Sequence, residues 1–169
     1  MFGDLKRSRI VAYSAAFVAL ITMGSWVSIP FFPVPITLQT MFVLLAGAVM
    51  KRYAVIPVSL YVLFGAIGLP VFHNGIAGIG VLLGPTGGYL IGFIPAALIV
   101  GIAYEQRSRL VRLAGLATGT MVILISGALW LCYSTGMLPV AALVGGVVIF
   151  LPGDAVKAGA TYLVAKRLP

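Results

Sequence analysis

The sequence has few charged residues and almost no acidic ones. Only 8% of its 169 residues are charged, and Asp and Glu together occur three times. A soluble globular domain carries about 25% charged residues, and a disordered chain has low hydrophobicity. With 62% hydrophobic residues and a mean hydropathy of +1.17, the chain is predicted to be an integral membrane protein.

Several other features are scarce or missing. The single cysteine, Cys132, excludes an intrachain disulfide, and the single histidine, His73, has no neighbouring Cys, Asp or Glu with which to bind a metal. The segment 84–88 is rich in glycine but lacks the lysine of a phosphate-binding loop. We therefore expect no metal, no cofactor and no ATP hydrolysis by this chain. The apolar runs also lack the period-two alternation of an outer-membrane barrel.

The apolar runs have the length of membrane-spanning helices. They predict one membrane domain over residues 1–169 with six spans, at about 10–29, 36–50, 53–69, 89–104, 113–133 and 139–165. The first run follows basic residues, as a signal peptide would, but it is long enough to cross a membrane. The expected fold class is therefore an all-α, six-helix transmembrane bundle.

The basic residues lie at every second boundary between these spans. They are Lys6, Arg7, Arg9, Lys51, Arg52, Arg107, Arg109, Arg112, Lys166 and Arg167. The connections 30–35, 70–88 and 134–138 carry no formal charge when His73 is neutral. The positive-inside rule then predicts that both termini are cytoplasmic and that the uncharged loops face outward. This distribution indicates that the net charge of +8 serves contact with the membrane surface and not with nucleic acid. The basic 107–112 loop is either a simple topology signal or a contact for anionic lipid or a partner protein.

Asp154 and Lys157 are the only charged residues deep inside an apolar run. A helix from Asp154 to Lys166 covers about 18 Å, which places the pair past the middle of a hydrocarbon layer roughly 30 Å thick. Residues three apart share a helix face, so the pair could be a buried ion pair that fixes helix register or part of a polar ligand site. We favour the ligand site, because a buried ion pair stabilises poorly once its desolvation is counted. Pro152 and Gly153 are expected to loosen the backbone just before it.

Two outer segments carry the other candidate ligand contacts. Thr37 and Gln39 open the second span, where Gln39 either contacts a ligand or bonds to another helix. The connection 68–88 is apolar and dense in glycine, so it is predicted to fold back over the bundle as a lid. Within it, Asn74 is a candidate lid contact, and 84–88 is expected to turn tightly into the fourth span.

Small residues repeat every four positions in the first span. Ala12 with Ala16, and Ala15 with Ala19, form two pairs that allow another helix to approach closely. That helix belongs either to the same bundle or to a separate subunit.

Four stretches together resemble the BioY family, the biotin-binding S components of energy-coupling-factor (ECF) transporters. They are Pro33-Val34-Pro35-Ile36-Thr37-Leu38-Gln39-Thr40, Gly68-Leu69-Pro70-Val71-Phe72, Gly84-Pro85-Thr86-Gly87-Gly88-Tyr89, and Gly153-Asp154 with Lys157. The resemblance covers nearly the whole chain in the expected order. It implies a six-helix bundle with an outward-opening pocket that takes up biotin across the cytoplasmic membrane.

The same resemblance implies partners and a binding site. The partners are a transmembrane coupling subunit, expected to dock on the alanine pairs, and two ATPase subunits. The implied ligand-binding residues are Asp154, Lys157, Asn74, Gly75, Tyr89, Gln39, Thr37 and Phe72. We expect Asp154 to accept the ureido N–H groups of biotin and Lys157 to donate to the ureido oxygen or offset the nearby negative charge, while Tyr89, Phe72 and Phe32 enclose its apolar rings. The biotin carboxylate would meet backbone N–H groups of the glycine loop or water.

Other functions remain open at this point. The chain could be a self-sufficient proton-coupled transporter with Asp154 as the coupling carboxylate, or an S component for another vitamin. A membrane-embedded enzyme using Asp154 and Lys157 is disfavoured, because no nucleophile-base constellation stands beside them in the sequence.

Overall fold

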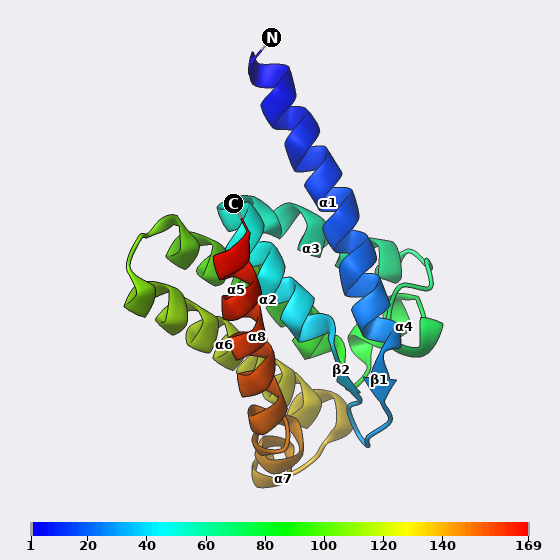
Figure 1. Cartoon of the computed structure of the whole chain (residues 1–169). Coiled ribbons are helices and arrows are strands. Elements are labelled where there is room, and N and C mark those ends of the chain that lie inside the picture. Colours follow the sequence, from blue (N-terminus) through cyan, green and yellow to red (C-terminus); the bar gives the residue numbers. More distant parts are fainter. Residues whose placement is uncertain (1, 169) are drawn as a thin grey trace.

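The computed structural model describes residues 2–168, and the side chains of residues 7–168. Its main elements are six helices (Figure 1): α1 (Phe2–Trp26), α2 (Gln39–Met50), α3 (Val55–Ala66), α5 (Gly87–Glu105), α6 (Arg109–Thr135) and α8 (Leu151–Arg167). Shorter elements connect them: β1 (Ser28–Ile29), β2 (Ile36–Thr37), the 3-10 turns η1 (Lys51–Ala54) and η2 (His73–Gly75), α4 (Ile79–Leu83), α7 (Pro139–Leu143) and the π-helical turn η3 (Val144–Val148). The predicted all-α membrane fold with six main helices is confirmed.

Five stretches of the described chain are long and apolar enough to cross a membrane. One of them, Gln39–Ala66, combines α2, η1 and α3. α2 and α3 have 12 residues each, so each helix is about 18 Å long, which is shorter than the thickness of a hydrocarbon layer, roughly 30 Å. The sequence predicted two separate short spans here. The structure instead shows two half-length helices that meet at η1 and point in different directions (Figure 1).

The core is organised around α5. It is the most buried of the five candidate spans, with 67% of its apolar window inside the protein. Its main neighbour is α6, and glycines bring the two helices together: a side chain at Gly88 or Gly92 would overlap Trp130 or Ser126 of α6. From the other direction, Gly127 of α6 leaves the space that the Tyr89 ring of α5 occupies. Helix contacts built on small residues are typical of membrane bundles.

The first and second spans end differently from the prediction. The sequence placed helix through 29 and again from 36, but Ser28 pairs with Thr37 and Ile29 with Ile36 in an antiparallel hairpin. The prolines between the two strands cannot continue a helix, and the paired strands satisfy backbone groups that would otherwise be left unbonded. α2 therefore begins only at Gln39.

The third and sixth spans also needed correction. α3 stops at Ala66, short of the predicted residue 69, because the chain turns at Gly68 with a φ of 108° that favours glycine. The predicted helix 139–165 is interrupted by η3, so the backbone break lies upstream of Pro152 and Gly153. Pro152 itself occupies the first turn of α8, where its missing N–H leaves no helical bond unmade.

The segment between α3 and α5 folds back against the bundle. The Phe72 side chain is fully buried, and its ring meets Tyr61 edge-on with centroids 5.6 Å apart. It fits beside Gly65 of α3, where an added Cβ would overlap the ring. The Gly78 N–H also donates to the Gly65 carbonyl at 2.7 Å. These contacts fix the segment, whereas its role as a lid stays a prediction.

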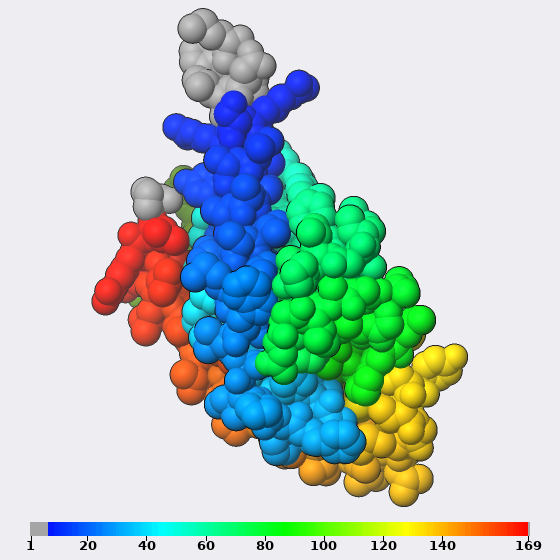
Figure 2. Space-filling model, turned by 90° about the vertical axis from the view of Figure 1, so that its right-hand side faces the viewer, coloured from blue at the N-terminus to red at the C-terminus, as the bar shows by residue number. Residues whose placement is uncertain are grey.

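α1 lies along the surface with one face buried. Ser14, Phe17, Ile21 and Ser25 face inward. In Figure 2, α1 (blue) runs down one face of the molecule, beside the segment near residues 60–85 (green). Its two alanine pairs, at positions 12, 15, 16 and 19, are exposed. They therefore do not serve as contacts within this bundle.

The basic helix ends gather on one side of the molecule. Figure 1 shows both chain ends on the same side as the η1 turn. There Arg52 of η1 donates two hydrogen bonds to Glu105 at the end of α5, at 2.7 and 2.6 Å. A paired guanidinium and carboxylate of this kind is geometrically specific. It ties the α2–α3 turn to the central helix, although which side of a membrane this is remains a prediction.

Replacing Gly65 by alanine should loosen the α3–α5 segment. The new methyl group occupies the place of the Phe72 ring, and overpacking of this kind costs about 1–3 kcal/mol. We expect a lower melting temperature and faster proteolysis within residues 67–86. Gly80→Ala is the matched control, because a Cβ there meets nothing within 4 Å. Equal stability of the two variants would show that Phe72 does not hold this segment in place.

Candidate functional site

A pocket lies between the main helices, next to the β1–β2 hairpin. It is lined by Val34, Pro35, Thr37, Gln39, Thr40, His73, Thr86, Tyr89, Leu90, Phe93, Ile123, Leu124, Phe150, Asp154 and Lys157. About half of these side chains are apolar or aromatic, and the others place polar groups among them, a combination that suits a small-molecule site. Its cavity measures about 40 Å³, whereas pockets that enclose a drug-sized ligand hold roughly 300–1,000 Å³.

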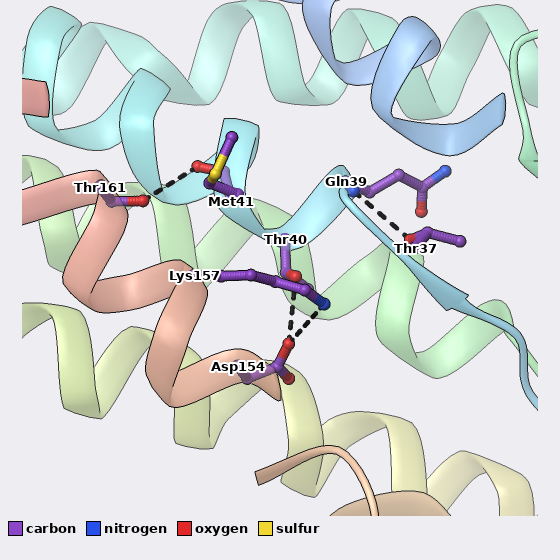
Figure 3. Close-up of polar contacts among 7 residues, drawn as sticks. All are labelled: Thr37, Gln39, Thr40, Met41, Asp154, Lys157 and Thr161. Atoms are coloured by element: carbon purple, nitrogen blue, oxygen red, sulfur yellow. Dashed lines mark hydrogen bonds and ion pairs between the residues drawn. The ribbon is translucent and has the colours of Figure 1, made fainter. Parts of the chain in front are cut away.

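An ion pair between Asp154 and Lys157 lies at the centre of this site (Figure 3). The Lys157 ammonium donates to Asp154 Oδ1 at 2.8 Å, and the two residues are only 8% and 2% exposed. Thr40 of α2 donates to the same oxygen at 3.2 Å. The predicted pairing on one helix face is therefore observed. Because both charges also line the pocket, the ion pair can meet a polar ligand directly.

Gln39 connects the pocket to the α3–α5 segment. Its Nε2 donates to the Tyr61 hydroxyl at 2.6 Å, and that hydroxyl donates to the Val71 carbonyl at 3.0 Å. Ser25 of α1 donates to the same carbonyl at 2.8 Å. Of the two interpretations offered for Gln39, bonding to another helix is thus observed. It does not exclude a ligand contact, since the side-chain carbonyl of Gln39 remains an acceptor.

Tyr89 joins the pocket to the irregular part of the chain before α8. Its hydroxyl donates to the Gly146 carbonyl at 2.8 Å, and its ring lies 6.1 Å from that of Phe150. Gly146 belongs to η3, a π-helical turn in which the usual helical bonds are shifted. A Cβ on Gly146 would come within 2.6 Å of the Tyr89 hydroxyl, so glycine permits this bond.

His73 lies between the pocket and a second, open hollow on the outside. That hollow is lined by Pro30, Phe31, Phe32, Pro33, Pro35, His73 and Asn74. Because Pro35 and His73 border both spaces, the hollow adjoins the pocket. Partial burial lowers the pKa of His73, so its neutral form is favoured near pH 7.

The structure brings together most, but not all, of the predicted ligand residues. Asp154, Lys157, Tyr89, Gln39 and Thr37 line the pocket. Three others do not: Phe72 is buried against α3, Asn74 lies in the outer hollow, where it accepts a hydrogen bond from Ser28 at 2.9 Å, and Gly75 is exposed beside it. Phe32, expected as a ring contact, is 90% exposed.

Sequence reasoning overlooked several pocket residues. Thr40 and Phe93 carried a usable signal, because Thr40 directly follows the predicted residue Gln39 and Phe93 lies one helical turn from Tyr89 on α5. Ile123 and Leu124 of α6 gave none, since they are apolar residues in an apolar helix. Among the described residues, no group of three His, Cys, Asp or Glu side chains could hold a metal ion.

The fold and site define a multi-pass membrane protein with an internal pocket whose charged groups form one buried ion pair. Comparison with known proteins supplies its family. Residues 3–169 match the BioY family, so the chain belongs to that family. Its relatives include "Biotin transporter BioY" of Thermotoga maritima, 43% identical over 154 residues that make up 90% of each chain. "Probable biotin transporter BioY" of Pyrococcus horikoshii is 38% identical and covers 96% of this chain and 97% of its own.

A solved structure is similar to the whole fold. It is described as the crystal structure of the S-component for biotin from an ECF-type ABC transporter. The match has a TM-score of 0.87 at 29% identity, and it covers 97% of this chain and 92% of that one.

Removing the Tyr61 hydroxyl should destabilise the fold measurably. In Tyr61→Phe, the buried Gln39 amide loses its acceptor and the Val71 carbonyl loses one donor, and a buried polar group left unpaired costs about 1–3 kcal/mol. Thermal unfolding of the purified protein should show the loss. Tyr133→Phe is the control, because that ring is 81% exposed. If both variants melt at the wild-type temperature, the network does not contribute to stability.

Proposed function

We propose that this chain binds biotin and mediates its uptake as the substrate-specific S component of an ECF transporter, and that it is not an enzyme. The observation that carries the proposal is its membership of the BioY family over residues 3–169. It is supported by relatives named as biotin transporters and by the similarity of the whole fold to an S component for biotin.

The chemistry of the pocket suits the biotin head group. Its ureido ring has two N–H donors and a carbonyl acceptor, and we assign the Asp154 carboxylate to an N–H and the Lys157 ammonium to the oxygen. Charge-assisted hydrogen bonds of this kind are strong in an apolar pocket. A ligand without these groups gains no hydrogen bond from either charge, so the site binds it less tightly.

The remaining lining residues suit the rest of the molecule. Tyr89, Phe93 and Phe150 offer aromatic surface to the fused rings, while Thr37 and Gln39 add neutral polar contacts. The carboxylate tail then points toward the outer hollow, where Asn74 and the Gly75 backbone lie. We propose that Asn74 and Gly75 contact the ligand there, the role that the sequence predicts for them.

Binding requires the pocket to enlarge. A cavity of about 40 Å³ does not hold biotin, and the boundary shared with the outer hollow runs through Pro35 and His73. We propose that the segment 67–86, tied down through Phe72 and Gly78, moves as a lid to admit the ligand. Lids of this kind move on microsecond to millisecond timescales.

The proposed orientation places this entrance outside the cell. The basic helix ends lie on one side of the molecule, together with both termini, and the positive-inside rule assigns that side to the cytoplasm. The chain would then be a multi-pass protein of the cytoplasmic membrane that takes biotin from outside.

Lys157→Ala in the full chain should weaken biotin binding at least tenfold, about 1.4 kcal/mol, because the ligand loses a charged donor and Asp154 its partner. Isothermal titration with purified protein measures the change. The matched control is Lys166→Ala, which removes a lysine from the exposed end of the same helix. Wild-type affinity in a folded Lys157→Ala protein would show that the ion pair does not contact biotin. Tighter binding of thiamine or riboflavin than of biotin would contradict the assigned substrate.

The coupling partners are inferred from the exposed face of α1. Its alanine pairs lie opposite the buried residues Ser14, Phe17 and Ile21, so they present a smooth surface away from the bundle. Small residues of this kind let another membrane helix approach closely. We assign this face to a transmembrane coupling subunit, with two separate ATPase subunits supplying the energy.

Ala16→Trp should abolish ATP-dependent biotin uptake by the assembled transporter and leave biotin binding to the isolated chain unchanged, because the indole blocks helix approach on an exposed face. Leu129→Trp is the control, since Leu129 is equally accessible, at 68% exposed, but belongs to α6 and not to the alanine face of α1. Loss of binding together with uptake would indicate a packing role instead. Uptake by liposomes that contain only this chain, driven by a proton gradient, would favour a self-sufficient transporter.

A further inference from the structure

A groove runs between α6 and α8 on the outside of the bundle. It has a volume of about 340 Å³ and is separate from the outer hollow. Its lining is almost entirely apolar and follows one face of each helix: Leu113, Leu116, Ala117, Thr120 and Met121 from α6, and Leu151, Asp154, Ala155, Ala158 and Gly159 from α8. Both helices are among the candidate membrane spans, so this groove opens to the hydrocarbon layer.

The basic residues around the groove are all at one end. Of those on α6, Arg109 is exposed, whereas Arg112 is half-buried, donates from Nε to the Gln106 carbonyl at 2.8 Å and lies over the Tyr104 ring. Arg109 lies one helical turn before Leu113, and Arg112 lies one turn before Leu116, so both continue the α6 side of the groove. On α8, Lys166 lies about two turns beyond Gly159. The two helices diverge toward these basic ends in Figure 1. At the other end of the groove, near Met121 and Leu151, the described residues of both helices carry no formal charge. The nearest charged residue there is Asp154.

The dimensions of the groove select the occupant. From Leu113 to Met121, α6 rises about 12 Å, so a volume of about 340 Å³ corresponds to a mean cross-section of about 30 Å². A helix with its side chains is about 10–12 Å wide and needs roughly 80 Å² or more. The groove is thus too narrow for a transmembrane helix and wide enough for a hydrocarbon chain.

We propose that this groove binds an anionic phospholipid. One acyl chain occupies the apolar groove between α6 and α8, and the phosphate lies at the basic end near Arg109 and Arg112. Apolar lining with basic residues at one end only matches the polarity of such a lipid, and Arg is well suited to phosphate. The acyl chain then covers the membrane side of Asp154, which lines both this groove and the ligand pocket.

The test measures lipid binding to the purified full chain by native mass spectrometry. Phosphatidylglycerol and phosphatidylcholine with identical acyl chains are titrated in a mild detergent. We expect phosphatidylglycerol to bind at least fivefold more tightly, and the double variant Arg109→Gln with Arg112→Gln to lose that preference. Arg7→Gln with Arg9→Gln is the charge-matched control, because it removes two exposed charges from α1, which does not line the groove. Equal binding of the two lipids to the wild-type chain would overturn the proposal.

A second pair of variants tests the acyl-chain half of the site. Gly159→Leu places a side chain in the groove without disturbing the fold, since a Cβ there meets nothing within 4 Å. We expect it to lower phosphatidylglycerol binding at least fivefold, whereas Thr118→Leu, at an exposed α6 position outside the groove, does not change it. Ala155→Leu fills the groove as well, should Gly159→Leu fail to fold.

Two outcomes would contradict this half of the proposal. Unchanged lipid binding in a folded groove-filling variant would show that the acyl chain lies elsewhere. Unchanged lipid binding together with loss of the coupling subunit would make the groove a protein interface. Neither result depends on biotin, so the proposed transport function can fail while this one stands.

Discussion

The structure depends on one buried ion pair inside an otherwise apolar bundle. Asp154 and Lys157 are 2% and 8% exposed, and a charge within a membrane is costly unless it is paired and hydrogen-bonded. Both charges of the ion pair belong to α8, but the further hydrogen bond to Asp154 comes from Thr40 of α2. One residue further along α2, the Met41 carbonyl accepts a hydrogen bond from Thr161 of α8 at 3.3 Å. Docking of α8 on α2 therefore satisfies the charges, and these charges in turn fix which face of α8 meets the pocket.

The π-helical turn before α8 helps to aim that ion pair. A π turn inserts an extra residue into a helix and rotates all that follows relative to a regular helix. The Tyr89 hydroxyl binds the Gly146 carbonyl within this turn, so α5 holds the irregular segment in place. The same ring lines the pocket. Tyr89 thus links the central helix, the backbone irregularity and the binding surface, which explains why a residue predicted only as a ring contact is also structural.

The parts of the fold set by hydropathy and charge were predictable from the sequence. Six main helices follow from the apolar runs, and the gathering of chain ends and η1 on one side follows from the alternating basic residues. Features set by tertiary contacts were not. Pairing of Ser28 with Thr37, insertion of Phe72 beside Gly65, and the display of Asn74 in the outer hollow each depend on neighbours distant in sequence. Phe72 and Asn74 are both candidate ligand contacts in the sequence, yet Phe72 stabilises the segment and Asn74 lines the outer hollow.

Asp154 contributes to two surfaces at once. It lines the pocket on one side and the α6–α8 groove on the other, so the wall between the two is a single side chain thick at this point. In water such a thin wall would not protect the Asp154 carboxylate, because solvent would compete for its hydrogen bonds. In a bilayer the outer side of the wall is hydrocarbon, which cannot hydrogen-bond, and the low dielectric strengthens every interaction of Asp154 on the inner side. A bilayer thereby completes the apolar surroundings of the pocket, and a small bundle can enclose a charged pocket without a second layer of helices around it.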